Sequence, residues 1–213
     1  MKVSLSIAGL ALVLSVSFLS SSAFSQDDKS GGYKHAPKGE QMDAETQAMM
    51  DAWAKYATPG AYHDNLKPLV GTWATTSKYW MKPGGDPKVG QGTAVKKMVL
   101  DGRYLSEDYS GMSAFGPFHG IGLTGYDNAR KKYVDTWVDS MGTGIMLSYG
   151  TCDSSGKTIT FQSEYEDPMD GKTKKHRSVI KIINNDKHIL EMFVTEPGQK
   201  EHKELEVIYT RKS

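Results

Sequence analysis

The chain has a single cysteine, Cys152, among its 213 residues. One cysteine cannot close an intramolecular disulfide, so the fold must rest on its hydrophobic core. Nor can it supply a paired-cysteine metal or redox motif, and no cysteine follows the N-terminal apolar run to carry the acyl chains of a lipoprotein. We therefore expect Cys152 to be a small buried apolar residue and not a nucleophile.

The short motifs of the common enzyme classes are also missing. The sequence has no Gly-x-Ser-x-Gly turn, no His-Glu-x-x-His helix and no glycine-rich phosphate loop before a helix. A barrel can assemble a catalytic set from distant strands, so this absence disfavours an enzyme without excluding one. The sequence predicts no catalytic residue and no metal ligand.

A surplus of charge of one sign is lacking too, because 26 Lys and Arg stand against 25 Asp and Glu. Binding to nucleic acid needs a basic surplus on one face, so we expect no nucleic-acid partner. The densest basic stretch, residues 172–177, fits the solvated start of a strand better than an anion site.

The longest apolar run, Val3 to Leu19, lies at the N-terminus. Lys2 precedes it and small residues follow it, which is the order of a secretory signal peptide over residues 1–25. Cleavage after Ser25 is preferred and cleavage after Ala23 is the alternative. The run is shorter than the roughly 20 residues that cross a bilayer. We expect an exported, soluble protein, periplasmic or extracellular, with no membrane insertion after signal cleavage.

The rest of the chain divides into three parts. Residues 26–41 are polar, with glycines and a proline, and predict a flexible leader. Residues 42–58 predict an amphipathic helix that ends at Pro59-Gly60. Its apolar positions are Met42, Met49, Trp53 and Tyr56. Residues 63–213 show no internal repeat and predict one domain.

Within that domain the hydrophobic pattern has a period of two. The expected strands are Val70–Met81, Gly92–Leu100, Arg103–Tyr109, Phe118–Tyr126, Lys132–Asp139, Thr143–Cys152, Thr158–Tyr165, Arg177–Ile183, His188–Thr195 and Lys203–Arg211. Turn residues such as Asp101-Gly102 separate them and join neighbours antiparallel. Closing such a meander removes both edges, so we predict an all-β, about ten-stranded up-and-down barrel with one N-terminal helix. An immunoglobulin-like sandwich is the alternative, although its cysteine pair is missing.

The two ends of this domain carry a further pattern. Gly71-Thr72-Trp73 opens the first strand, after Leu66 and Leu69, and Tyr209-Thr210-Arg211 ends the last strand. This resembles the calycin pattern, in which a tryptophan plugs one barrel end and a basic residue covers its indole. An arginine over an indole gains cation–π attraction while its donors bond carbonyls. Gly71, Trp73 and Arg211 are thus the expected closure of the barrel, with Arg211 over Trp73 at the end opposite the pocket mouth.

The whole stretch from His63 to Arg211 is similar to a bacterial family of exported proteins with a domain of unknown function, number one thousand five hundred and seventy-nine. The residues that carry this resemblance are Pro59-Gly60, His63, Leu66, Leu69, Gly71-Thr72-Trp73, Gly125-Tyr126-Asp127-Asn128, Tyr133, Trp137, Asp139-Ser140-Met141, Gly171 and Tyr209-Thr210-Arg211. The resemblance implies a lipocalin-like barrel, and it implies no established activity.

Two segments are the candidates for a ligand pocket. The candidate residues are His119, Ile121, Leu123, Tyr126, Trp137, Asp139 and Met141. Glycines between residues 116 and 125 leave space for a ligand or for a close backbone approach, or else mark a bend that closes the barrel. Asp139 shares the parity of Trp137, so it is either an inward polar anchor or an acceptor for the turn at residues 140–142. His119 fits a structural role as well as a ligand-binding one.

Three functions follow from this barrel. The first is binding of a small apolar or amphipathic molecule in a cavity, without a cofactor. The second is a haem-binding or catalytic barrel, by analogy with the nitrobindins. Its candidate histidines are His119, His176, His188 and His202. The third is a structural or partner-binding role through the helix between Met42 and Tyr56. The sequence leaves the ligand and the oligomeric state open.

Overall fold

The computed structural model describes residues 43–113 and 115–212. The expected signal peptide at 1–25, the leader at 26–41 and Met42 lie outside the described residues. The N-terminal part of the described chain is helical, with α1 (Ala44–Ala57), the short α2 (Ala61–Asp64) and the 3-10 helix η3 (Lys67–Leu69). Asp43 begins α1, because its carboxylate accepts the backbone N–H of Thr46 at 2.7 Å.

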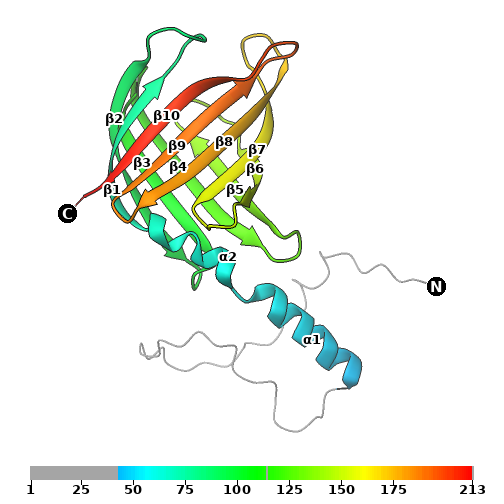
Figure 1. The fold of residues 1–213 in the computed structure, drawn as a ribbon. Helices are drawn as coiled ribbons and strands as arrows, with labels where there is room; N and C mark the ends of the chain where they lie inside the picture. Colours follow the sequence, from blue (N-terminus) through cyan, green and yellow to red (C-terminus); the bar gives the residue numbers. More distant parts are fainter. Residues whose placement is uncertain (1–42, 114, 213) are drawn as a thin grey trace, which may run out of the picture. The chain divides into compact units, whose positions relative to one another are not determined.

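Ten antiparallel strands form one closed barrel (Figure 1). They are β1 (Gly71–Tyr79), β2 (Lys88–Val99), β3 (Tyr104–Ser113), β4 (Gly116–Asp127), β5 (Lys132–Asp139), β6 (Met146–Cys152), β7 (Thr158–Glu166), β8 (Thr173–Asn184), β9 (Lys187–Thr195) and β10 (His202–Arg211). Each strand pairs with its neighbours in sequence, and β10 returns to pair with β1. The predicted ten-stranded up-and-down barrel is confirmed, and the sandwich alternative is wrong.

The strand bounds differ from expectation mainly where polar residues or glycines extend a strand. β2 begins at Lys88 and not at Gly92, and β8 begins at Thr173 and not at Arg177. In both strands the additional residues pair in regular register, with β1 and with β7. The backbone ladder continues where the hydrophobic alternation has already stopped.

One end of the barrel is covered by α2 and η3 (Figure 1). Leu66 and Leu69, which flank and end η3, are fully buried against inward-facing residues of the strands. These partners are Leu105, Tyr133, Ile159, Phe161 and Ile182. The Tyr133 hydroxyl donates to the carbonyl of Tyr62 at 2.8 Å. This end is therefore closed by a packed apolar core.

Trp73 and Arg211 meet beside this closed end. The guanidinium carbon of Arg211 lies 4.2 Å from the Trp73 ring centroid, and the indole N–H donates to the carbonyl of Leu69 at 2.9 Å. Arg211 also donates to the carbonyls of Val70, Pro68 and Asn185, at 2.8, 3.2 and 2.7 Å. The contact expected between Arg211 and Trp73 is thus present, and it joins the first strand, the last strand and the β8–β9 turn.

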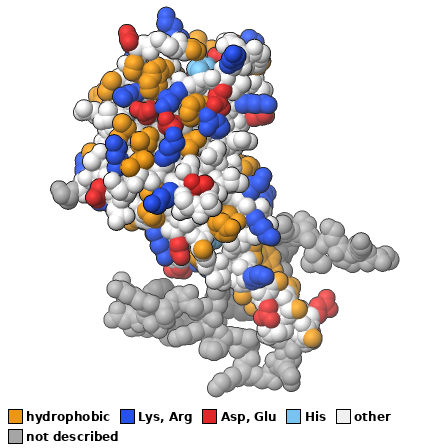
Figure 2. All heavy atoms as spheres, in the orientation of Figure 1, with side chains coloured by type: hydrophobic (Ala, Val, Ile, Leu, Met, Phe, Trp, Pro, Cys, Tyr) orange, Lys and Arg blue, Asp and Glu red, His pale blue; other side chains and the backbone are white. Residues whose placement is uncertain are grey.

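The outer surface of the barrel mixes charges of both signs (Figure 2). On β8 to β10, Glu191 pairs with Lys181 at 2.6 Å and with Lys203, which also pairs with Glu206 at 3.0 Å. Exposed pairs of this kind contribute little to stability, so the outer charges chiefly keep the wall solvated.

Helix α1 buries none of its residues. Its apolar side chains Met49, Met50, Trp53 and Tyr56 are 42% to 51% exposed. The side chain of Asn128 donates to the carbonyls of Tyr56 and Thr58 at 2.8 and 2.9 Å, which ties the end of the helix to the β4–β5 turn. Within residues 43–113 and 115–212, no helix combines the length and apolar character that crossing a bilayer requires.

A substitution at Gly71 tests whether the contact between Trp73 and Arg211 stabilises the barrel. Its φ of 141° is one that side chains rarely adopt, and a Cβ there would lie 2.2 Å from Nη1 of Arg211. We expect Gly71→Ala to lower the free energy of unfolding by roughly 2 kcal/mol or more, because it adds backbone strain and displaces Arg211. Denaturant titration followed by tryptophan fluorescence measures the change.

Gly144→Ala is the matched control, because a Cβ at Gly144 meets nothing within 4 Å and its φ is ordinary. A Gly71→Ala protein that is as stable as the Gly144→Ala protein would contradict the role assigned to the closure.

Candidate functional site in the barrel lumen

The register of the strands determines which side chains face the lumen. Trp73 and Thr75 are buried on β1, and every residue paired with them shares their face. Following the register around the barrel places Lys96, Glu107 and Asp135 inside. The inward faces of the strands therefore carry polar and charged residues in the middle of the lumen, next to the apolar core that fills the closed end.

Lys96, Glu107, His188 and Tyr209 form one connected polar cluster. The Lys96 ammonium lies 3.1 Å from Oε2 of Glu107 and 3.2 Å from Nε2 of His188. It also lies 4.2 Å from the ring centroid of Tyr209, whose hydroxyl donates to Oε1 of Glu107 at 3.2 Å. The His188 ring stacks on Tyr209 at 4.1 Å and meets Trp73 edge to face at 4.3 Å. The closure and the polar cluster are thus in direct contact.

Burial fixes the protonation states in this cluster. Burial, and then the positive charges of Lys96 and Arg211, lower the pKa of His188 to about 2, so its imidazole is neutral. An ammonium only donates, so Nε2 of His188 accepts from Lys96 and the ring proton is assigned to Nδ1. Nδ1 is buried and has no partner among the described residues. Burial also raises the pKa of Tyr209 well above its usual value, so its hydroxyl stays a donor.

Asp135 lies beside this cluster without an ion pair among the described residues. Its Oδ1 accepts the Thr124 hydroxyl at 2.6 Å. Burial, reinforced by the charge of Glu107, raises the pKa of Asp135 to about 7, against the lowering effects of Thr124 and Lys96. The carboxyl group is therefore half protonated near neutral pH.

The carboxyl groups of the lumen are not sealed from solvent. Asp135 is only half-buried and Glu107 keeps 17% of its side chain accessible, although both lie among inward-facing residues of the barrel. Across the β5–β6 pair, Ser148 faces Asp135 and is 1% exposed. Its hydroxyl has no partner in the described chain. The middle of the barrel thus holds accessible carboxylates and an unsatisfied hydroxyl.

An aromatic wall lines the lumen around these residues. The Trp137 ring lies against β4, because a Cβ on Gly120 would be 2.2 Å from the ring and one on Gly122 would be 3.1 Å from it. Phe118 is nearly parallel to Trp137, at 6.5 Å between centroids, and Tyr109 meets Phe118 edge to face at 5.7 Å. The glycines of β4 therefore allow a close approach of Trp137, which keeps its ring against the wall.

Asp139 combines the two roles that the sequence offered. It faces inward and accepts the Trp137 indole N–H at 2.9 Å, and its other oxygen accepts the backbone N–H of Met141 at 2.8 Å. Asp139 thus orients the indole and holds the β5–β6 turn at the same time.

The structure separates the other residues predicted for the pocket. His119, Ile121 and Leu123 lie on the outer face of β4, because alternation places them opposite Phe118, Gly120 and Gly122. Ile121 and Leu123 are 49% and 38% exposed, and His119 pairs with Asp108 at 3.1 Å. Met141 is an exposed turn residue, and Tyr126 stacks on Tyr62 at the closed end. Only Trp137 and Asp139 come together in the lumen, so grouping His119, Ile121 and Leu123 with them is corrected.

Lys96, Glu107 and Asp135 are not among the pocket residues that the sequence predicts. One signal could have revealed two of them, namely a charged residue on the face of a strand that is otherwise apolar. Glu107 lies on the same face as Leu105 and Tyr109, and Lys96 lies on the same face as Ala94 and Met98. Of the four histidines considered for haem, His176 and His188 are buried, His202 is half-buried and His119 is exposed. Within the described chain, no three His, Cys, Asp or Glu residues are grouped to hold a metal ion.

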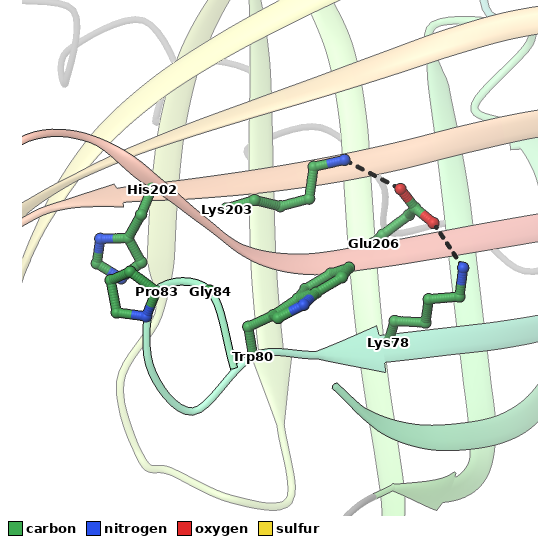
Figure 3. A pocket seen from close by; sticks show the side chains of 7 residues that line it. All are labelled: Lys78, Trp80, Pro83, Gly84, His202, Lys203 and Glu206. Carbon is green, nitrogen blue, oxygen red and sulfur yellow. Dashed lines mark hydrogen bonds and ion pairs between the residues drawn. The ribbon is translucent and has the colours of Figure 1, made fainter. Parts of the chain in front are cut away.

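Two hollows lie at the surface. One, of about 360 Å³, lies where β1 ends beside the start of β10, with Trp80, Pro83, Gly84 and His202 along it (Figure 3). Its charges are already paired, because Glu206 lies between Lys78 and Lys203, at 3.4 and 3.0 Å (Figure 3).

The second hollow, of about 570 Å³, lies where β6 and β7 separate. These strands pair only from Tyr149↔Gln162 to Cys152↔Ile159, whereas β7 and β8 pair along the full length of β7. Outward-facing Gln162 and Glu164 and inward-facing Ser163 and His176 line the same hollow. It therefore reaches both faces of the wall.

The raised pKa of Asp135 predicts a dependence of stability on pH. The pKa rises from 3.8 to about 7, so the unfolded chain releases the proton first and the free energy of unfolding falls as pH rises from about 4 to about 7. Asp135→Asn removes this penalty. We expect the variant to gain on the order of 2 kcal/mol over the wild type at about pH 8, and little at about pH 4.

Urea titrations at both pH values measure this difference. Asp108→Asn is the control, because Asp108 is a 66% exposed carboxylate on the outer face of β3. Equal effects of the two substitutions at about pH 8 would show that Asp135 is not desolvated.

Comparison with known proteins identifies the family of the chain. The model of the family described as protein of unknown function (DUF1579) matches residues 58–211. No curated protein matches. One similar solved structure, described as EF1p2_mFAP2b bound to DFHBI, is 13% identical with a TM-score of 0.38, covering 71% of this chain and 100% of its own.

A redesigned beta barrel, b11L5F_LGL, is 11% identical with a TM-score of 0.32, covering 70% of this chain and 96% of its own. Likeness at this level carries no argument about ligand or activity. The family model matches more than half of the chain. The barrel from the end of α1 to Arg211 therefore belongs to the DUF1579 family of proteins of unknown function.

Proposed function

We propose that this chain is an exported protein that binds a small amphipathic molecule in the barrel lumen. The polar end of the ligand lies at Asp135, Glu107 and Lys96, and its apolar part lies against Trp137 and Phe118. The observation that carries the proposal is Asp135, an inward carboxyl group without an ion pair in the described chain, beneath an aromatic wall.

The energetics of burial support this proposal. A buried carboxyl or hydroxyl without a full set of hydrogen bonds destabilises a fold by about 1–3 kcal/mol. The lumen contains several such groups, among them Ser148 Oγ and His188 Nδ1. A barrel filled only for stability would have apolar residues at these positions, as the closed end does. Polar groups in this place are expected where a ligand or water completes their hydrogen bonds.

The shape of the wall supports it as well. Trp137 lies against Gly120 and Gly122, and the Tyr109 hydroxyl lies over Gly92, where a Cβ would be 2.6 Å from it. Rings that lie along the wall present their faces to the lumen and do not project across it. Such faces bind apolar groups over a large area.

The sequence supports the exported location in this proposal. The N-terminal segment has the order of a signal peptide. The destination in this proposal is the periplasm or the exterior.

A brominated alcohol tests binding in the lumen. Bromine quenches indole fluorescence at contact range, and the chain has four tryptophans. Trp73 and Trp137 both face inward, but Trp73 is fully buried at the closed end, whereas Trp137 lies beside the proposed site. We expect 11-bromo-1-undecanol to produce saturable quenching that Trp137→Phe removes in large part. Fluorescence titration measures this, and the phenylalanine keeps an apolar wall so that the binding itself survives.

Trp80→Phe is the matched control, because Trp80 lines the outer hollow of Figure 3. It should leave the saturable quenching in place. The proposal is overturned if the wild type shows no saturable quenching, or if Trp80→Phe removes it and Trp137→Phe does not.

A further inference from the structure

Several carboxyl groups face the lumen. Glu107, Asp135 and Asp139 face inward on β3 and β5, and Glu204 joins them at the open end, where it accepts the hydroxyl of inward-facing Tyr79 at 3.1 Å. Among the described residues, Asp135, Asp139 and Glu204 make no ion pair. Burial raises the pKa of Glu204, as it does for Asp135. These carboxyl groups therefore have no cation at ion-pair distance among the described residues.

Cations face inward as well. Lys88 does so at the open end, opposite Tyr79, with its ammonium 5.6 Å from the Phe115 ring centroid. Lys96 and Lys174 are engaged by carboxylates. Lys96 contacts Glu107, His188 and the face of Tyr209, which occupies its three donors. Lys174 pairs with Asp167 at 2.6 Å and with Glu196 at 3.5 Å. An anionic ligand would thus meet no free cation beside Asp135, and it would be repelled by Glu107.

The aromatic wall favours a cation as well. The indole N–H of Trp137 is bonded to Asp139, which leaves the ring face for the ligand. Ring faces attract ammonium groups, and tryptophan does so most strongly. The hydroxyl of Ser148, which has no partner among the described residues, is buried in the wall next to Asp135 and adds no positive charge there.

We propose that the lumen takes an organic ammonium ion with an apolar group, and that the ammonium lies between Asp135 and the face of Trp137. This inference rests on the proposed function, because it names the ligand class of the same site. The apolar group extends along Phe118 and Tyr109. The ligand supplies a countercharge to Asp135.

Ionisation of Asp135 is then coupled to binding. The groups that face it are Thr124 from β4, Ser148 from β6, Glu107 from β3, Lys96 from β2, His188 from β9 and Tyr209 from β10. Glu107 and Lys96 are a mutual pair, and His188 and Tyr209 stay neutral. Asp135 is therefore the group of this set that changes charge near neutral pH. A bound cation favours its ionised form, so affinity rises with pH and proton release accompanies binding.

The experiment compares probes that share one chain and differ in charge. Decyltrimethylammonium, 1-decanol and decyl sulfate are titrated into the full protein by calorimetry. The two surfactants are kept below their micelle concentrations, and 1-decanol is kept below its solubility limit. Each is also tested for displacement of 11-bromo-1-undecanol from Trp137. The quaternary ammonium does not titrate, so any change in its affinity between about pH 5.5 and about pH 8.5 comes from ionisation of the protein.

We expect decyltrimethylammonium to bind about tenfold or more tightly than 1-decanol at about pH 8, and to lose most of this advantage at about pH 5.5. Asp135→Asn should remove the advantage at both pH values, whereas Asp108→Asn should preserve it. The wild type alone provides a second measurement. In buffers of different ionisation enthalpy, about half a proton should be released per cation bound at about pH 7.

The possible failures are distinguishable. If 1-decanol or decyl sulfate displaces the bromo-alcohol as well as the cation does, the ligand class is overturned while lumenal binding stands. The ligand class is likewise overturned, and lumenal binding stands, if cation binding releases no protons and is independent of pH. If no probe binds and the bromo-alcohol does not quench Trp137, the proposed function is overturned together with this inference.

Discussion

The contact between Trp73 and Arg211 is the constraint on which the rest of the structure depends. It holds the first strand against the last and fastens η3 and the β8–β9 turn to the same point. Closure removes both sheet edges and gives every strand an inside and an outside. His188 packs on the inner side of Trp73, so the closure also supports the ring on which the Lys96 cluster rests.

Above that point the barrel interior changes character. The closed end is packed with leucine, isoleucine and aromatic side chains, whereas the middle holds a lysine, two carboxyl groups and a buried histidine. A polar layer of this kind weakens a core unless its groups are paired. Lys96, Glu107 and Tyr209 are paired with one another, and Asp135 remains outside the network of ion pairs. The paired residues therefore have a structural role, whereas Asp135, at the same level of the barrel, is left as the candidate ligand-binding group.

The sequence predicts the architecture of this chain well, because turn residues and two-residue alternation are local properties. It therefore places ten strands in order, and the ends of the domain indicate the closure. It fails on the face of β4, because apolar Ile121 and Leu123 suggest the interior, while the inward positions are the glycines. Their space is filled by Trp137 from the next strand. Lys96 and Glu107 become visible as neighbours only once the register of β2 and β3 is known.

The short ladder between β6 and β7 has a mechanical consequence. Beyond Tyr149↔Gln162, toward Met146 and Glu166, these strands share no paired residues, so the ladder of backbone hydrogen bonds is interrupted there. A closed sheet relaxes at its weakest seam, and this seam lies beside inward-facing Ser163 and His176. Because separating strands that share few backbone hydrogen bonds disrupts the least structure, we expect any local opening of the wall to occur between β6 and β7, with the other nine strand pairings intact.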